Sequence, residues 1–167
     1  MEKNRLIIFE LITGKMKEKI GEIAIIAAFL ALLDQISKVL IVKYLDAPYG
    51  IINGILQIEY AENTGMAFGI SMPYPVLIVA SIILLAVLPY VWAKEFDIRR
   101  PMARITIAFI LGGAMGNMID RIVNGYVVDF IAIWKWPNFN LADVFIIVGI
   151  LLTIIFYAKM KNDERKN

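Results

Sequence analysis

Cysteine and histidine are both absent from the 167 residues of this chain. Without cysteine, the chain cannot form disulfides, thiol nucleophiles, lipidated cysteines or cysteine metal sites. Without histidine, the Ser-His-Asp and Cys-His arrangements and every His-ligated zinc motif are excluded as well. Any chemistry must therefore come from Asp, Glu, Lys, Arg, Tyr, Ser, Thr or Asn.

Charged residues are also scarce, at 19% of the chain, whereas hydrophobic residues make up 60%. Soluble globular domains contain roughly 45–50% apolar residues, and the mean hydropathy here is +0.71. A soluble fold of this size cannot bury so much apolar surface, because small domains keep a large ratio of surface to volume. The composition therefore indicates a membrane protein, and it excludes a disordered chain, a nucleic-acid binder and a disulfide scaffold.

Four stretches are long and apolar enough to cross a bilayer, which takes about 20 residues. They cover residues 23–42, 76–93, 103–122 and 141–158. Between them, ILQIEY at 55–60 and VVDFIAI at 127–133 have the composition of short strands. We therefore expect an all-α membrane protein: a bundle of four transmembrane helices with a small extracytoplasmic β-sheet or loop cradle. Residues 21–160 are predicted to form a single membrane-embedded domain.

Most of the 17 basic residues fall in the N-terminal segment, in the turn between the second and third spans, and in the tail. Lysine and arginine concentrate in cytoplasmic loops, so both termini are predicted to be cytoplasmic and the two long loops to lie outside. Residues 1–20 contain a short apolar run followed by lysines, which favours an amphipathic segment on the inner membrane surface. Residues 161–167 are predicted to be a cytoplasmic tail.

Two of the predicted spans contain charged side chains, which are costly inside a bilayer and therefore mark candidates for function. Asp34 and Lys38 in the first span share one helix face, so they can form a structural pair or contact a substrate. In the third span, Asp120 and Arg121 follow Asn117. The Arg121 guanidinium can hold a lipid phosphate or a peptide carbonyl, or it can pair with Asp120 or Asp34. The sequence leaves these alternatives open.

Glycines 112, 113 and 116 of the third span have the spacing of small residues that let membrane helices approach closely. This structural interpretation is sufficient for them.

Asp129 and Asp143 form the sharpest candidate site. Asp129 follows the third span on the outer side, and Asp143 lies in the first turn of the fourth span, which begins on the outer side. Two carboxylates at one depth can share a proton, so that one activates water while the other protonates a scissile carbonyl. The alternative for Asp143 is a charge favoured at a helix N-terminus, and the alternative for Asp129 is a loop charge.

Five motifs in order resemble those of the lipoprotein signal peptidase (signal peptidase II) family. They are DQISK at 34–38, NTGMAF at 63–68, GGAMGNMIDRI at 112–122, VVDFI at 127–131 and FNLAD at 139–143. The resemblance covers residues 22–158, nearly the whole chain. Met66 stands where the family often has alanine, a mild departure.

The resemblance implies an aspartyl endopeptidase of the bacterial cytoplasmic (inner) membrane with its active site near the outer face. Its substrates would be diacylglyceryl-modified prolipoproteins, cut just before the lipidated cysteine. Membrane phospholipid and globomycin-type inhibitors are further implied partners; no cofactor, metal or nucleic acid is expected. The matching positions are Asp129 and Asp143 as catalytic residues, Asn63, Asn117, Arg121 and Asn140 as substrate-binding residues, and Asp34, Lys38 and Asp120 as structural or cleft support.

Two other classes remain as alternatives. The buried polar residues of the first and third spans suit a small ion-coupled transporter or channel subunit, although the two sharpest carboxylates lie at one interface and not at the midplane. The glycine-rich face of the third span suits a non-enzymatic membrane assembly protein.

Overall fold

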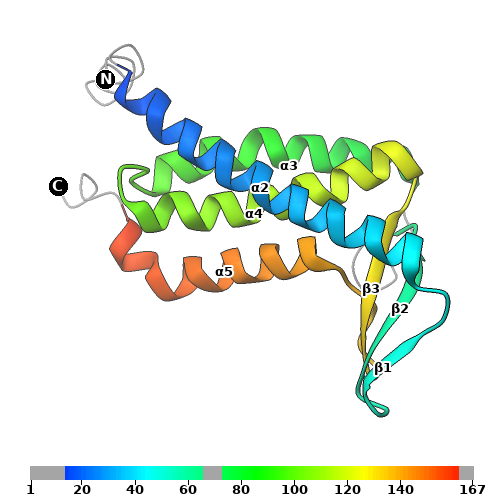
Figure 1. The fold of residues 1–167 in the computed structure, drawn as a ribbon. Coiled ribbons are helices and arrows are strands. Elements are labelled where there is room, and N and C mark those ends of the chain that lie inside the picture. The colour runs from blue at the N-terminus through cyan, green and yellow to red at the C-terminus, as the bar shows by residue number, and fades with distance from the viewer. Residues whose placement is uncertain (1–13, 66–72, 162–167) are drawn as a thin grey trace.

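The computed structural model describes residues 14–65 and 73–161. Within these residues the chain forms four helices and three strands (Figure 1). Their order is α2 (Lys15–Tyr44), β1 (Tyr49–Ile52), β2 (Leu56–Asn63), α3 (Tyr74–Glu95), α4 (Pro101–Asn124), β3 (Val127–Ile133) and α5 (Leu141–Met160).

Each of the four helices is long and apolar enough to span a membrane. Large apolar side chains cover their outer surfaces, with Ile25 on α2 and Ile154 on α5 exposed by 72% and 68%. Such exposure is expected when lipid, and not water, surrounds the bundle. The helix bundle with its small sheet confirms the predicted fold class.

The predicted spans agree with the helices except at the start of α2. This helix begins at Lys15 and runs without a break through residue 20, where the sequence predicts the end of a separate N-terminal segment. Lysine and glutamate are good helix formers, so a helix can extend past the apolar stretch that crosses the membrane. Residues 1–13, which hold the rest of that predicted segment, lie outside the described residues.

α4 packs against α2 and α5 and lies at the centre of the bundle. Glycines make these close contacts possible. A Cβ atom on Gly112 would lie 2.8 Å from Leu30 Cβ of α2, and one on Gly113 would lie 2.7 Å from Ile146 Cγ1 of α5. The small-residue face predicted from the sequence thus brings both neighbouring helices close to α4.

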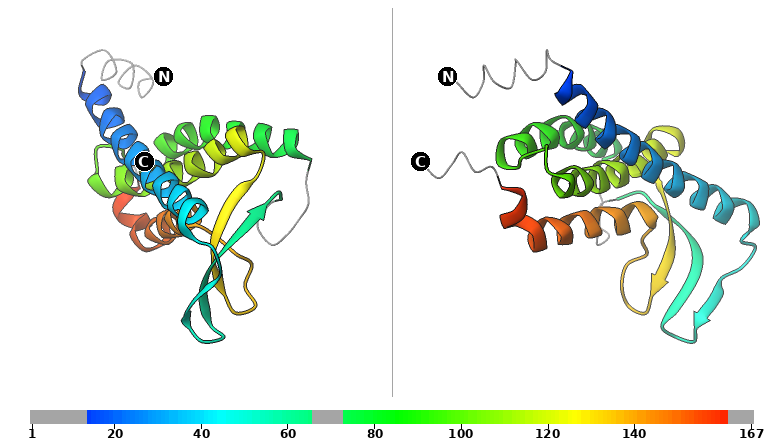
Figure 2. Two further views of the ribbon diagram at one scale, coloured as in Figure 1. Left: turned by 45° about the vertical axis from the view of Figure 1, so that its right-hand side comes forward. Right: turned by 60° about the vertical axis from the view of Figure 1, so that its left-hand side comes forward.

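The three strands form one antiparallel sheet in the order β1-β2-β3. It extends from one end of the bundle and projects sideways past α5, whereas the start of α2 and the end of α5 lie at the other end (Figures 1 and 2). Ala61 of β2 pairs with Asp129 of β3, after an irregularity in register between Ile58 and Ala61. The sheet therefore places Asn63, which begins the NTGMAF motif, next to the VVDFI motif of β3.

Candidate active site

Asp129 lies on β3 with only 2% of its surface exposed. Asn63 Nδ2 donates to its Oδ2 at 2.9 Å, and Asn140 Nδ2 donates to its Oδ1 at 2.7 Å. Burial and the nearby charge of Asp143 raise the pKa of the Asp129 carboxyl to about 6, although the two amides act in the opposite direction. A carboxyl with this pKa can exchange its proton near neutral pH.

Asp143 lies in the first turn of α5, where it belongs to a capping box with Asn140. The Asn140 side chain accepts from Asp143 N at 3.0 Å, and the Asp143 carboxylate accepts from Asn140 N at 3.3 Å. Asn117 Nδ2 of α4 donates to Asp143 Oδ1 at 2.8 Å. The Asp143 side chain therefore caps the N-terminus of α5 and also belongs to the polar site.

Asn140 connects the two aspartates. Its Oδ1 accepts the Asp143 backbone N–H, so its Nδ2 must face the other way, where it donates to Asp129 and to Asn117 Oδ1. Asn63 is oriented in the same manner, because its Oδ1 accepts from Gly65 N at 3.0 Å and leaves Nδ2 for Asp129. All four carboxylate oxygens of Asp129 and Asp143 thus accept an N–H from an asparagine.

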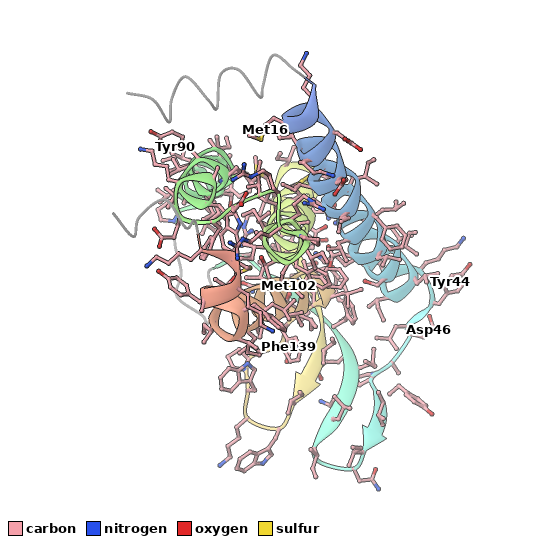
Figure 3. The ribbon with its side chains drawn as sticks, turned by 90° about the vertical axis from the view of Figure 1, so that its left-hand side faces the viewer. Met16, Tyr44, Asp46, Tyr90, Met102 and Phe139 are labelled. Carbon is pink, nitrogen blue, oxygen red and sulfur yellow. The ribbon has the colours of Figure 1, made fainter. Side chains whose placement is uncertain are left out.

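The return of the chain from β3 to α5 places Asn140 beside Asp129. Phe139 pairs with Ile131 of β3, through N–H···O bonds of 3.1 and 2.8 Å. Figure 3 shows Phe139 where the chain passes from the sheet to α5. The pairing keeps the two segments in register, so that the helix begins directly next to the strand.

A cavity of about 870 Å³ lies between β2, β3, α4 and α5. Asp129, Asp143, Asn117 and Arg121 contribute to its polar part, and its remaining walls are largely apolar. The lining residues are Ala61, Glu62, Asn63, Thr64, Gly65, Asn117, Arg121, Val127, Asp129, Ile133, Trp136, Pro137, Asn138, Phe139, Asp143, Ile146 and Ile147. The volume lies within the range of ligand-binding pockets, which is roughly 300–1,000 Å³.

Lys38 pairs with Asp34 at 2.7 Å, as the spacing on the helix predicted, and also with Asp120 at 2.8 Å. All three side chains are buried, with exposed fractions of 0%, 2% and 2% for Asp34, Lys38 and Asp120. Gly116 leaves room for this cluster, since a Cβ atom there would lie 2.5 Å from Asp34 Oδ2. None of the three lines the cavity.

Arg121 is separate from this cluster. Its Nη1 donates to Asn117 O at 3.3 Å, and Asp34 and Asp120 are both occupied by Lys38. Across residues 14–65 and 73–161, Arg121 makes no ion pair, and its guanidinium lines the cavity. Of the two sequence interpretations, the geometry favours contact with a ligand.

Several polar residues at or near the site were not identified from the sequence. Gln35 Nε2 donates to Asp120 Oδ1 at 2.8 Å and to Gly116 O at 3.1 Å. Glu62, Thr64 and Asn138 line the cavity. Gln35 and Thr64 lie within the DQISK and NTGMAF motifs, although no role in the site was predicted for either, whereas Glu62 and Asn138 lie outside all five motifs.

The family model described as Signal peptidase (SPase) II matches residues 26–159 of the chain. A lipoprotein signal peptidase from Caldicellulosiruptor bescii is 41% identical over 134 residues, which cover 79% of this chain and 87% of that protein. One from Caldanaerobacter subterraneus subsp. tengcongensis is 41% identical over 132 residues, which cover 77% of this chain and 90% of that protein.

Two solved structures share the fold. A bacterial membrane enzyme determined by the in meso method at 2.3 Å resolution has a TM-score of 0.74 at 33% identity and covers 84% of this chain and 89% of its own. A second, at 1.9 Å resolution, has a TM-score of 0.72 at 32% identity and covers 83% of this chain and 93% of its own.

Proposed function

This chain belongs to the signal peptidase II family, and from that membership we propose that it is an aspartyl endopeptidase that removes signal peptides from diacylglyceryl-modified prolipoproteins, with Asp129 and Asp143 as its catalytic pair. The observation that carries the mechanism is the placement of both carboxylates on one cavity, bridged by Asn140. The raised pKa of Asp129 is consistent with a pair that holds one proton close to neutral pH.

In the proposed reaction, the ionised carboxylate takes a proton from a water molecule, and the water oxygen attacks the scissile carbonyl carbon. The protonated carboxyl donates its proton to the carbonyl oxygen, which gives a tetrahedral intermediate. Proton transfer to the amide nitrogen then breaks the C–N bond. Asn63, Asn117 and Asn140 hold the carboxylates in place, since each donates an N–H to one of them.

The walls of the cavity support a lipid-modified substrate. Ile147 on α5 is 53% exposed on the surface of the bundle and also lines the cavity, so the cavity borders the lipid-facing side of that helix. An acyl chain attached next to the cut can pass along this apolar wall while the peptide lies at the aspartates. We propose that cleavage occurs just before the lipidated cysteine, and that Arg121 binds a substrate carbonyl or a lipid phosphate. Globomycin-type inhibitors are proposed to occupy the same cavity.

The charge distribution supports a location in the bacterial cytoplasmic membrane with both termini inside. In that orientation the sheet lies at the outer face, and Trp134 and Trp136, exposed by 75% and 59%, are placed to anchor it at the interface. The active site then lies near the outer surface, where a signal peptide with a lipidated end would present its cut site.

Membership in a peptidase family favours this function over the transporter and assembly hypotheses. The buried polar residues that suggested a transporter also bond mainly to one another, as the ion pairs of Lys38 with Asp34 and Asp120 show.

The function is tested by incubating the purified protein in detergent with a diacylglyceryl-modified prolipoprotein and with the unmodified precursor. Only the modified precursor should be shortened, and mass spectrometry should place the lipidated cysteine at the new N-terminus. A chelator should not change the rate, because the proposed chemistry uses carboxylates alone. Cleavage at another position, or equal cleavage of the unmodified precursor, would count against the proposal.

A further inference from the structure

The Lys38 ammonium contacts three polar side chains. Its Nζ lies 2.7 Å from Asp34 Oδ2 and 2.8 Å from Asp120 Oδ2, and it donates to Asn117 Oδ1 at 3.1 Å. An ammonium group has three donors and no acceptor, so these contacts use all of its hydrogen-bonding capacity. A simple neutralising pair on one helix would need only one of the two carboxylates.

The two carboxylates bound to Lys38 each hold a backbone N–H on another element. Asp34 Oδ1 accepts from Ala142 N at 2.9 Å, and Ala142 directly precedes Asp143. Asp120 Oδ2 accepts from Val128 N at 3.0 Å, and Val128 directly precedes Asp129. One ammonium therefore lies between two carboxylates that hold the two backbone segments of the proposed catalytic pair.

The third contact of Lys38 reaches the pair more directly. Asn117 accepts from Lys38 through Oδ1, and its Nδ2 donates to Asp143 Oδ1 at 2.8 Å. Because the ammonium can only donate, it favours the orientation of the Asn117 amide that presents N–H to Asp143.

We propose that Lys38 is a positioning residue for the reaction, which sets the separation of Asp129 and Asp143 by holding Asp34 and Asp120 together. The inference rests on the proposed function of Asp129 and Asp143 as a pair. Without the ammonium, the two ion pairs that join Asp34 to Asp120 through Lys38 would be lost, and the backbone segments that these carboxylates hold would no longer be kept at a fixed separation. A displacement of about 1 Å at a catalytic group can reduce the rate roughly a hundredfold.

Charge-conserving double variants separate this role from simple neutralisation. The wild-type cluster has two carboxylates and one ammonium, so Asp34→Asn with Lys38→Met keeps its net charge, as does Asp120→Asn with Lys38→Met. Both pairs should melt closer to the wild type than Lys38→Met alone. The kcat of each pair should nevertheless fall roughly tenfold to a hundredfold with little change in KM.

Lys19→Met with Glu22→Gln is the matched control. It removes another ion pair of α2, at 2.7 Å, without changing the net charge, and neither residue belongs to the Lys38 cluster or lines the cavity. Its kcat should remain close to that of the wild type. If the double variants recover kcat together with thermal stability, Lys38 only neutralises buried charge and the proposal is wrong.

Hydrogen exchange tests the same proposal without relying on the reaction. In the wild type, the amides of Val128 and Ala142 should exchange slowly, and both should exchange faster in a folded double variant, while amides around Trp92 at the other end of the bundle stay unchanged. Fast exchange of either amide in the wild type would overturn the proposal. An absence of peptidase activity in the wild type would instead overturn the proposed function, and slow exchange could still be observed.

Discussion

The side chain of Asp129 shows how a single residue can be suited to acid–base chemistry at some cost to folding. Burial favours its neutral form, and so does the charge of Asp143, whereas Asn63 and Asn140 donate to its oxygens and favour the charged form. Burial is the larger effect, so the folded protein holds this proton more tightly than the unfolded chain does.

This difference predicts how stability changes with pH. The pKa of Asp129 is about 6 in the folded chain against an ordinary value of 3.8, so its contribution favours folding at low pH and is lost as the pH rises through about 6. Asp129→Asn has no such proton to lose. From pH 7 to pH 5, the wild type should therefore gain about 1–2 kcal/mol in free energy of unfolding relative to this variant. Thermal melts of both proteins at the two pH values measure the gain, and parallel pH dependence would contradict it.

At the scale of the elements, the structure depends on how closely α4 approaches its neighbours. Gly116 faces α2 at the point where Asp34 lies, and its missing side chain leaves space for the carboxylate. That carboxylate in turn accepts the N–H of Ala142 near the start of α5. The separation of α2 and α4 is thereby connected to the position of the helix that contains Asp143.

Gly116→Ala should therefore destabilise the protein. The new Cβ atom would lie 2.5 Å from Asp34 Oδ2, so the buried carboxylate or the helices must shift. Such overpacking costs about 1–3 kcal/mol. Gly21→Ala on α2 is the control, because nothing lies within 4 Å of a Cβ atom there, and alanine is a better helix former than glycine. Melting temperatures in detergent should fall for the first variant and stay level or rise for the second; equal values would contradict the packing account.

The elements themselves could be predicted from the sequence to different degrees. The run VVDFIAI forms β3 with the bounds expected, and the spans at α3, α4 and α5 lie inside the observed helices. β1 was not predicted, because YGII is a short exposed strand that pairs only with β2 and has no alternating burial. Patterns along a chain identify elements that bury one face, and they miss those held mainly by backbone pairing.

The sequence predicts which residues belong to the site, but it does not predict the hydrogen bonds between them. The depth of Asp129 and Asp143 followed from the order of spans and loops, so their common cavity could be expected. The contacts of Asp34 with Ala142 N and of Gln35 with Asp120 join positions 108 and 85 apart in the sequence. Spacing rules for a single helix or strand do not reach such contacts, because they depend on how the helices pack.

At the scale of the whole molecule, orientation in the membrane decides what the cavity can meet. The sheet lies at one end of the bundle, and the start of α2 and the end of α5 lie at the other (Figures 1 and 2). The cavity is lined by β2 and β3 and therefore lies at the end with the sheet. The side with the sheet must face the outer leaflet for the proposed substrate to reach the aspartates.

The absence of cysteine makes this orientation simple to test with single introduced cysteines. Lys135→Cys, next to the exposed Trp134, should react with a membrane-impermeant maleimide on intact spheroplasts. Arg99→Cys, whose side chain is 61% exposed in the wild type, lies between α3 and α4 and should react only after permeabilisation. The reverse pattern would contradict the predicted topology.

The central claim is that Asp129 and Asp143 act as one catalytic pair. The most direct test is the initial rate of cleavage of a diacylglyceryl-modified prolipoprotein by the wild type, Asp129→Asn, Asp143→Asn, the double variant and Asp46→Asn. Figure 3 shows Asp46 beyond the end of α2, and this exposed carboxylate does not line the cavity, so its variant should stay active. Each single variant of the pair should fold, retain some globomycin binding and lose roughly three or more orders of magnitude in rate, with the double variant little worse than either. Substantial cleavage by a well-folded Asp129→Asn or Asp143→Asn protein would contradict the aspartyl mechanism.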